Sequence, residues 1–159
     1  MRTARERRDE LLAIYAQAER SLPPRDCTRS TGCCRFSLTG REPHVTQAEL
    51  DLLLEHVAAS GRRIPPHRSD GACPFLAADE TTCTVYDARP FGCRTHFCRA
   101  AGGAVPAREL RDSLRRLAQL DEELGSDARG SRPLTRALRD GAVIALRQRQ
   151  PKARKPARG

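Results

Sequence analysis

The chain has 159 residues, of which 38% are apolar and 4% aromatic, and it contains no tryptophan. This length and composition predict one small domain with a thin core, which a cross-link or a bound metal would help to stabilise. The formal net charge of +9 comes mainly from arginine, and no window approaches the roughly 18 apolar residues of a membrane span. The charged start "MRTARERRDELL" has no apolar signal-peptide core, so we expect a soluble cytoplasmic protein with reduced thiols and no membrane partner.

Two amphipathic helices are predicted in the first third of the chain. Residues 3–20 repeat apolar side chains at helical spacing, and the sequence "SLPP" ends the pattern. A second helix begins at Thr46, which forms a T-x-x-E capping box with Glu49, and it ends at Gly61. Its apolar stripe consists of Leu50, Leu53, Leu54, Val57 and Ala58.

Short strands and turns are expected around the second helix. Phe36 and Leu38 alternate as in a short strand before it. After it, the sequence "ACPFLAADETTCTVYDARPFGC" predicts two short strands around a polar turn at 79–82. Pro90 and Gly92 should interrupt regular structure beyond these strands. The middle of the chain is therefore predicted to be rich in loops.

Two further helices are predicted in the last third. Residues 106–125 have a proline near their start and a glycine at their end, and 133–148 form a weaker helix that Gly141 interrupts. One face of the first of these helices carries Leu110, Leu114, Leu117 and Leu124. The basic segment 150–159 has no apolar anchor and should be disordered.

These elements predict an α+β, mainly helical fold: a small single domain whose loop-rich core, with short strands, is organised by a cysteine-ligated metal. We divide the chain into an N-terminal helix at 1–22, a cysteine-cluster core at 23–105, C-terminal helices that pack on this core at 106–149, and a tail at 150–159.

All seven cysteines lie in the loop-rich middle and none lies on the predicted long helices. They are Cys27, Cys33, Cys34, Cys73, Cys83, Cys93 and Cys98. An odd number cannot pair completely within one chain, and a cytoplasmic setting disfavours a disulfide framework. Several thiolates held on tight turns are what a zinc or iron–sulfur site requires. The alternative is that some of these cysteines are buried free thiols, and the spacing alone matches no standard zinc finger.

Four blocks of this cysteine-rich region resemble the YkgJ-type family of zinc- or iron-chelating cysteine-cluster proteins. The blocks are "CTRSTGCC", "CPFL", "CTVYDARPFGC" and "CRTHFC", and they occur in the family's order over roughly residues 27–98. The resemblance implies that the seven cysteines ligate a metal, either zinc or an iron–sulfur cluster. A related domain occurs in flagellin lysine N-methylases, which implies an enzymatic use only by analogy.

Ser30 stands where the family pattern has its second cysteine. A serine oxygen is a poor zinc or iron ligand, so this position either opens the metal site or marks its decay. Of the histidines, His96 inside "CRTHFC" is the first candidate for a nitrogen ligand in place of Ser30, and His67 is the second. We interpret His56 as structural and His44 as a loop residue.

Four polar residues lie near the cysteines in the sequence, and each has an expected role. Arg89 and Arg94 flank the thiols and are expected to donate to sulfur or to nearby carbonyls, which would balance thiolate charge. The alternative is that they bind an anionic substrate. We interpret Tyr86 as a packed strand residue and Asp87 as a turn former.

The leading function is metal binding, with a metal that is mainly structural. An iron–sulfur redox or transfer enzyme, and a zinc module that binds a protein or nucleic acid, stay as alternatives. No complete catalytic motif is visible, so the sequence does not decide whether the protein is an enzyme. Nucleic acid is not the expected partner, because few aromatic residues lie among the basic ones. No protein partner is indicated.

Overall fold

A computed structural model describes residues 2–22, 31–96, 101–125 and 130–149, and the side chains in these ranges up to residue 141. The fold is a small, mainly helical α+β domain with one two-stranded sheet among the described residues, as predicted. In these ranges, no helix combines the length and the apolar character that crossing a membrane would need. The predicted tail at 150–159 lies outside the described residues.

The elements follow one another along the chain with short connections in most places. In order they are α1 (Ala4–Ser21), η1 (Gly32–Cys34), α2 (Phe36–Thr39), β1 (His44–Val45), α3 (Gln47–Ala59), η2 (Tyr86–Ala88), α4 (Phe91–Thr95), α5 (Ala107–Glu122), β2 (Arg132–Pro133) and α6 (Leu134–Arg149), where η marks a 3₁₀ turn.

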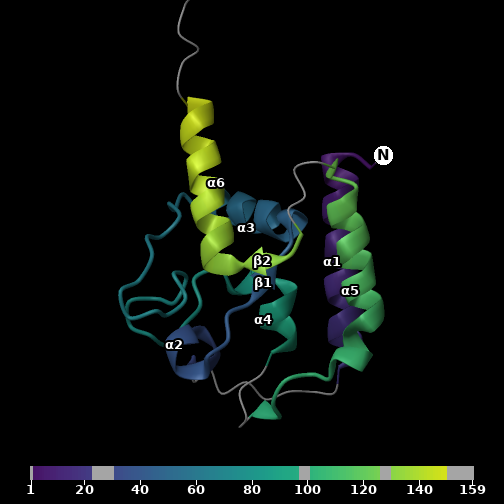
Figure 1. Ribbon diagram of the computed structural model, residues 1–159, viewed down its shortest axis with the longest axis horizontal. Coiled ribbons are helices and arrows are strands. Elements are labelled where there is room, and N and C mark those ends of the chain that lie inside the picture. Colours follow the sequence, from purple (N-terminus) through teal and green to yellow (C-terminus); the bar gives the residue numbers. More distant parts are fainter. Residues whose placement is uncertain (1, 23–30, 97–100, 126–129, 150–159) are drawn as a thin grey trace, which may run out of the picture.

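The two long helices α1 and α5 lie side by side and form one edge of the molecule (Figure 1). Thr3 and Glu6 close a capping box at the start of α1. The buried face of α1 carries Leu11, Ile14 and Tyr15, and these side chains pack with α5 and α4 in one apolar cluster. The helix predicted at 3–20 is therefore confirmed, displaced by one residue.

Helix α3 is central because it buries two faces at once. Leu50 and Leu53 are fully buried in a cluster with the cysteine-rich segments and α6, whereas Leu52 packs in the cluster of α1 and α5. The predicted capping box of Thr46 and Glu49 is present. Leu52 was missing from the predicted stripe, since a single stripe does not account for a helix that is covered on two sides.

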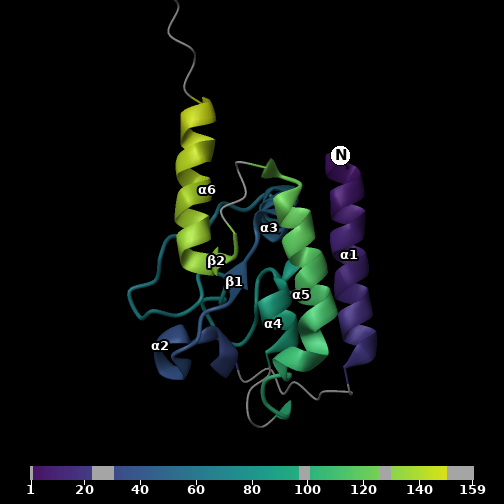
Figure 2. The same cartoon turned by 45° about the vertical axis from the view of Figure 1, so that its right-hand side comes forward.

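A short antiparallel ladder joins the segment before α3 to the segment before α6. β1 pairs with β2 so that His44 lies opposite Pro133 and Val45 opposite Arg132. The Glu42 carboxylate then accepts the backbone N–H of Thr135 at 2.6 Å and caps the start of α6. Both views show α6 on the opposite side of the molecule from α1 (Figure 2).

Three predicted details of the cysteine-rich middle are wrong. Phe36 and Leu38 belong to the single helical turn α2, where the chain closes with Gly40 in the left-handed conformation, and not to a strand. Pro90 and Gly92 do not interrupt regular structure: Pro90 is the N-cap of helix α4 and Gly92 is its second residue, since a proline at a helix start removes no helical hydrogen bond. The two strands expected around residues 79–82 reduce to an isolated bridge between Leu76 and Cys83.

Two details of the last third are also wrong. Leu114 is 45% exposed, and α5 buries Leu120 instead, because its core-facing side is set by contact with α1. Gly141 does not interrupt α6, which continues through it. Gly141 faces Leu50 and Leu54 of α3, and a methyl group added there would make ordinary van der Waals contact with their side chains at 3.5–3.7 Å.

Candidate metal centre

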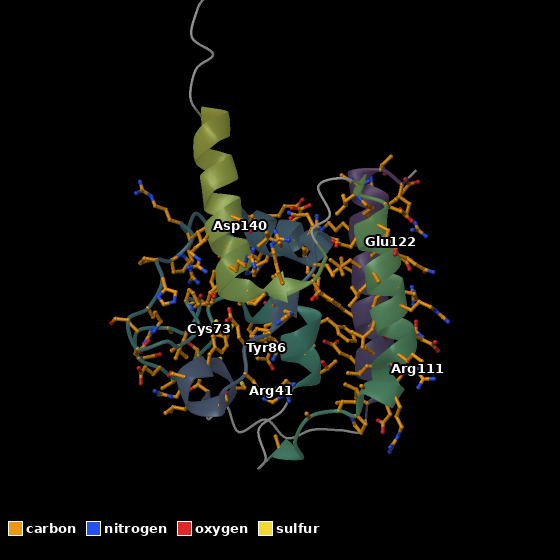
Figure 3. All side chains as sticks on the ribbon, viewed as in Figure 1. Arg41, Cys73, Tyr86, Arg111, Glu122 and Asp140 are labelled. Carbon is orange, nitrogen blue, oxygen red and sulfur yellow. The ribbon has the colours of Figure 1, made fainter. Side chains whose placement is uncertain are left out.

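Five cysteines from four separate segments line one cavity of about 630 Å³. They are Cys33, Cys34, Cys73, Cys83 and Cys93. All five are free thiols. Figure 3 shows Cys73, with Tyr86 and Arg41, on the side of the molecule that holds α2 and α4, away from Arg111 and Glu122 of α5. Cys27 and Cys98 lie outside the described residues, as does Ser30.

The adjacent pair Cys33 and Cys34 sits in the tight turn η1. Thr31 enters this turn in the left-handed conformation, with φ of 54°, so the chain reverses within a few residues. The backbone N–H of Cys73 donates to the Cys34 carbonyl at 2.7 Å. This bond fixes the "CPFL" segment directly against the cysteine pair, although the two are about 40 positions apart in the sequence.

Glu80 connects the turn between Cys73 and Cys83 to the segment around η1. Its carbonyl accepts the Thr31 hydroxyl at 2.7 Å, and its carboxylate accepts Arg35 at 2.7 Å and Arg68 at 3.2 Å. Glu80 itself has a φ of 59°, an unfavourable region for a residue with a side chain. This strained residue is held because three groups from two other segments bind it.

Cys83 and Cys93 are the other two cysteines that line the cavity. Cys83 is positioned by its bridge to Leu76 and by the Thr84 N–H, which donates to the Phe75 carbonyl at 2.9 Å. Cys93 lies on α4, whose first N–H, from Phe91, donates at 2.7 Å to the buried carboxylate of Glu49 on α3.

The Cys33 and Cys34 thiols share a hydrogen bond, and the bond separates their acidities. Donation from Cys34 lowers the pKa of Cys33 to about 6, and the positive charge of Arg89 acts in the same direction. The same bond, followed by burial, raises the pKa of Cys34. Cys33 is therefore the thiol of the pair that ionises first, and the thiolate is the form that binds metals.

The other three thiols resist ionisation. Burial raises the pKa of Cys73 to about 12, and it is also the main reason that the pKa values of Cys83 and Cys93 are raised. Negative charge on Cys83 raises the pKa of Cys73 and of Cys93 further, which places these thiols within electrostatic reach of one another. Arg89 opposes the increase at Cys83 and Cys93.

The donors around the cavity fit a thiophilic metal by their chemistry. Thiolate and imidazole are the preferred ligands of zinc, and thiolates hold iron–sulfur clusters. Within the described ranges, however, no three His, Cys, Asp or Glu side chains are arranged so that they could hold one metal ion. A metal in this cavity therefore requires side-chain rotation, or donors from the rest of the chain.

A family comparison agrees with this donor set. The family model CxxCxxCC, described as "Putative zinc- or iron-chelating domain", matches residues 26–114, which is more than half of the chain. The chain belongs to the CxxCxxCC family. The matched range contains all seven cysteines, so the resemblance to a cysteine-cluster family is confirmed. Comparison with curated proteins and with solved structures gives no match.

The pattern that names the CxxCxxCC family corresponds here to Cys27, Ser30, Cys33 and Cys34. The described half of this pattern, Cys33 and Cys34, lines the cavity. Because Ser30 replaces the second cysteine, this member of the family has one thiol fewer than the pattern provides.

The histidines fall into two groups. His44 and His96 line the cavity, whereas His56 and His67 do not. His44 was expected in a loop but lies on strand β1 and is exposed. His96 follows α4, and burial, together with the charge of Arg41, lowers the pKa of its imidazole. Its Nδ1 atom is covered from solvent and has no hydrogen-bond partner within the described part of the chain.

The two flanking arginines have different surroundings. Arg89 lines the cavity and lies 3.6 Å above the ring of Tyr86. Arg94 turns away from the thiols: it donates to the carbonyls of Asp87 and Arg89 and pairs with Glu19 of α1. Arg89 also donates to the Tyr86 carbonyl at 2.9 Å, so the prediction of donation to carbonyls is confirmed for both arginines. Of the two, only Arg89 lines the cavity, where its charge acts on the thiols.

Two other expectations about polar residues have mixed outcomes. Tyr86 is not a packed strand residue, since it lies on the 3₁₀ turn η2 and is 42% exposed. Asp87 lies on the same turn, as a turn former should.

The supporting residues Glu49 and Glu80 were not predicted as part of the site. Glu49 had a signal as a capping residue, but nothing in the sequence indicates its contact with Phe91.

Proposed function

We propose that the protein binds zinc or an iron–sulfur cluster through its cysteines, with all seven as candidate ligands: Cys27, Cys33, Cys34, Cys73, Cys83, Cys93 and Cys98. One observation carries the proposal, namely that five cysteines spread over 61 positions, from 33 to 93, line a single cavity. Cys73 belongs to the apolar cluster around α3 and α6, and Cys34 and Cys83 pack against it, so the cysteines that line the cavity lie at the edge of this core.

The charges around the cavity support a cation there. Several thiols within electrostatic reach of one another cannot all ionise, and burial raises the pKa of Cys73 to about 12. Arg89 supplies a single positive charge near Cys33, Cys83 and Cys93. A divalent metal or an iron–sulfur cluster would supply the additional positive charge that thiolates need, and it would release their protons on binding.

The primary role that we propose for the metal is structural. The segment between α3 and η2 contains no helix or strand element, and it carries Cys73 and Cys83. Its buried Phe75 and Leu76 anchor it in the core, and the rest is held by a few backbone bonds and by the partly exposed carboxylate of Glu80, whose ion pairs contribute little individually. Metal–thiolate bonds would join this segment to η1 and α4, which fits our proposed core at 23–105 between the flanking helices.

Metal analysis and an absorption spectrum of anaerobically purified protein test the proposal. Colourless protein with stoichiometric zinc supports a zinc site, and brown protein with iron and sulfide supports an iron–sulfur cluster. Protein that is folded and carries neither metal, even after reconstitution with zinc or with iron and sulfide, contradicts the proposal.

The size of the cavity supports a second candidate function, a redox or transfer enzyme. A volume of about 630 Å³ is within the range of small-molecule pockets, whereas one water occupies only about 30 Å³. Phe36, Pro43 and Leu134 contribute apolar surface to its lining. An iron–sulfur cluster that is reversibly reduced at an accessible potential would favour this function, and a redox-inactive zinc site would exclude the redox form of it.

The compartment and the partners follow from the same chemistry. The five free thiols support a reducing environment, so we propose the cytoplasm as the location. A metal ion is the proposed partner. Binding to nucleic acid is not proposed, and any that is observed should disappear when the basic segment 150–159 is removed.

A further inference from the structure

His96 follows Cys93 by three positions at the end of α4. The helix runs from Phe91 to Thr95, and His96 is the residue that caps it. Residues three positions apart on a helix lie on one face, with Cβ atoms about 5–6 Å apart. Cys93 and His96 both line the cavity, so this short Cys-x-x-His segment turns two donors toward the same space.

The imidazole of His96 has an unmet bonding requirement among the residues that the structure describes. Its Nδ1 atom is covered from solvent and has no hydrogen-bond partner in those residues. Buried polar atoms in folded proteins are almost always paired, so an unpaired one calls for a missing group. Among the four histidines, all of which the structure describes, His96 is the only one with such an atom.

The neighbours of the imidazole do not meet this requirement. Arg41 is the charged group that acts on it, and no hydrogen bond joins the two side chains within the described ranges. The Glu42 carboxylate, which also lines the cavity, is engaged with the Thr135 N–H at 2.6 Å. A metal ion would accept the lone pair of a neutral imidazole nitrogen.

We propose that His96 is a nitrogen ligand of the metal, bound through Nδ1 beside the Cys93 thiolate. This rests on the proposed metal-binding function. The ligand set then mixes sulfur and nitrogen, and the imidazole restores the donor that is lost where Ser30 replaces a cysteine. His44, which lines the same cavity from strand β1 but is exposed and has no unmet buried nitrogen, is not a ligand.

The test compares the full-length protein with His96→Ala, His96→Cys and the matched control His44→Ala. X-ray absorption at the metal edge detects imidazole scattering in a zinc protein. For an iron–sulfur cluster, nitrogen couplings after ¹⁵N-histidine labelling give the same information. Metal affinity is measured by competition with a chromophoric chelator, and circular dichroism of each variant checks that it is folded.

We expect an imidazole signal in the wild type and in His44→Ala and its absence in His96→Ala. Metal affinity should fall at least tenfold in His96→Ala and recover in His96→Cys, which offers a thiolate at the same position. A metal-loaded wild type with sulfur ligands alone overturns the inference and leaves the proposed function intact. A wild type that binds no metal overturns the proposed function itself. If His96→Ala does not fold, the wild-type spectrum and His96→Cys still decide the question.

Discussion

The buried carboxylate of Glu49 joins three helices, and replacing it should uncouple them. Glu49 is 2% exposed and lies on α3. One oxygen accepts the Tyr15 hydroxyl of α1 at 3.1 Å and the Phe91 N–H of α4 at 2.7 Å, and the other accepts the N–H and hydroxyl of Thr46 at 2.9 and 3.0 Å. All four partners donate, so the side chain must be an acceptor on both oxygens.

The substitution Glu49→Gln retains the size of the side chain but replaces one acceptor with an amide NH₂ group. In either orientation this group faces one backbone N–H, from Phe91 or from Thr46, and a backbone N–H cannot reverse its polarity. Leaving one buried donor unpaired costs about 1–3 kcal/mol, and we expect a loss of this size in the free energy of unfolding.

Urea unfolding of metal-free protein measures this loss, with Glu55→Gln as the control. Glu55 is on the same helix but is exposed, and the one ion pair it makes among the described residues is a 3.9 Å contact with Arg8, so its replacement should change stability by less than about 0.5 kcal/mol. Since α4 carries Cys93, metal affinity should also fall in Glu49→Gln. A loss below about 0.5 kcal/mol in Glu49→Gln would refute the role assigned to this carboxylate.

Three other predictions address the cavity and its support. Replacing Cys73 with serine should lower metal content, and it should destabilise metal-loaded protein more than metal-free protein. If inductively coupled plasma analysis finds the same metal content in the variant and the wild type, Cys73 is not a ligand. Because burial raises the pKa of Cys73 to about 12, metal-free protein should lose stability as pH rises above about 8.5, where the thiol of the unfolded chain ionises. Metal-loaded protein should instead lose metal and stability as pH falls. Thermal melts of both forms over a range of pH should show these opposite slopes. Gly71→Ala should lower the free energy of unfolding more than Gly103→Ala does. The two glycines have similar φ angles of 70° and 73°, but only at Gly71 would the added methyl group lie 3.1 Å from Ser37. Denaturation curves of the two variants, measured in parallel, give the difference.

The long helices could be predicted because their signals are local. The capping box of Thr46 and Glu49 and the apolar spacing of residues 3–20 depend on neighbours within a few positions, and the structure confirms both. Helix α4 was missed because Pro90 was interpreted as a breaker, although proline suits the start of a helix. The strand at Phe36 was predicted from two alternating residues, too few to outweigh the turn that closes at Gly40.

The cysteine set could be predicted from chemistry, but its support could not. Thiols concentrated in loops indicate a metal site without any knowledge of the fold, and five of the predicted seven line one cavity. The contacts that hold them depend on residues far apart in sequence, such as Glu49 with Phe91 and Glu80 with Arg35. Periodicity and spacing contain no information about such pairs, so these two carboxylates were identified only in the folded chain.

Titration of metal-free protein with Co²⁺ tests most directly whether the cysteines share a metal. Cobalt reports thiolate ligation through sulfur-to-metal charge-transfer absorption, and zinc should displace it. We predict absorption that saturates at a stoichiometric cobalt ratio and weakens when Cys33, Cys73 or Cys93 is replaced by serine. Cobalt binding without charge-transfer absorption, or absorption that none of these replacements changes, would contradict a metal centre in this cavity.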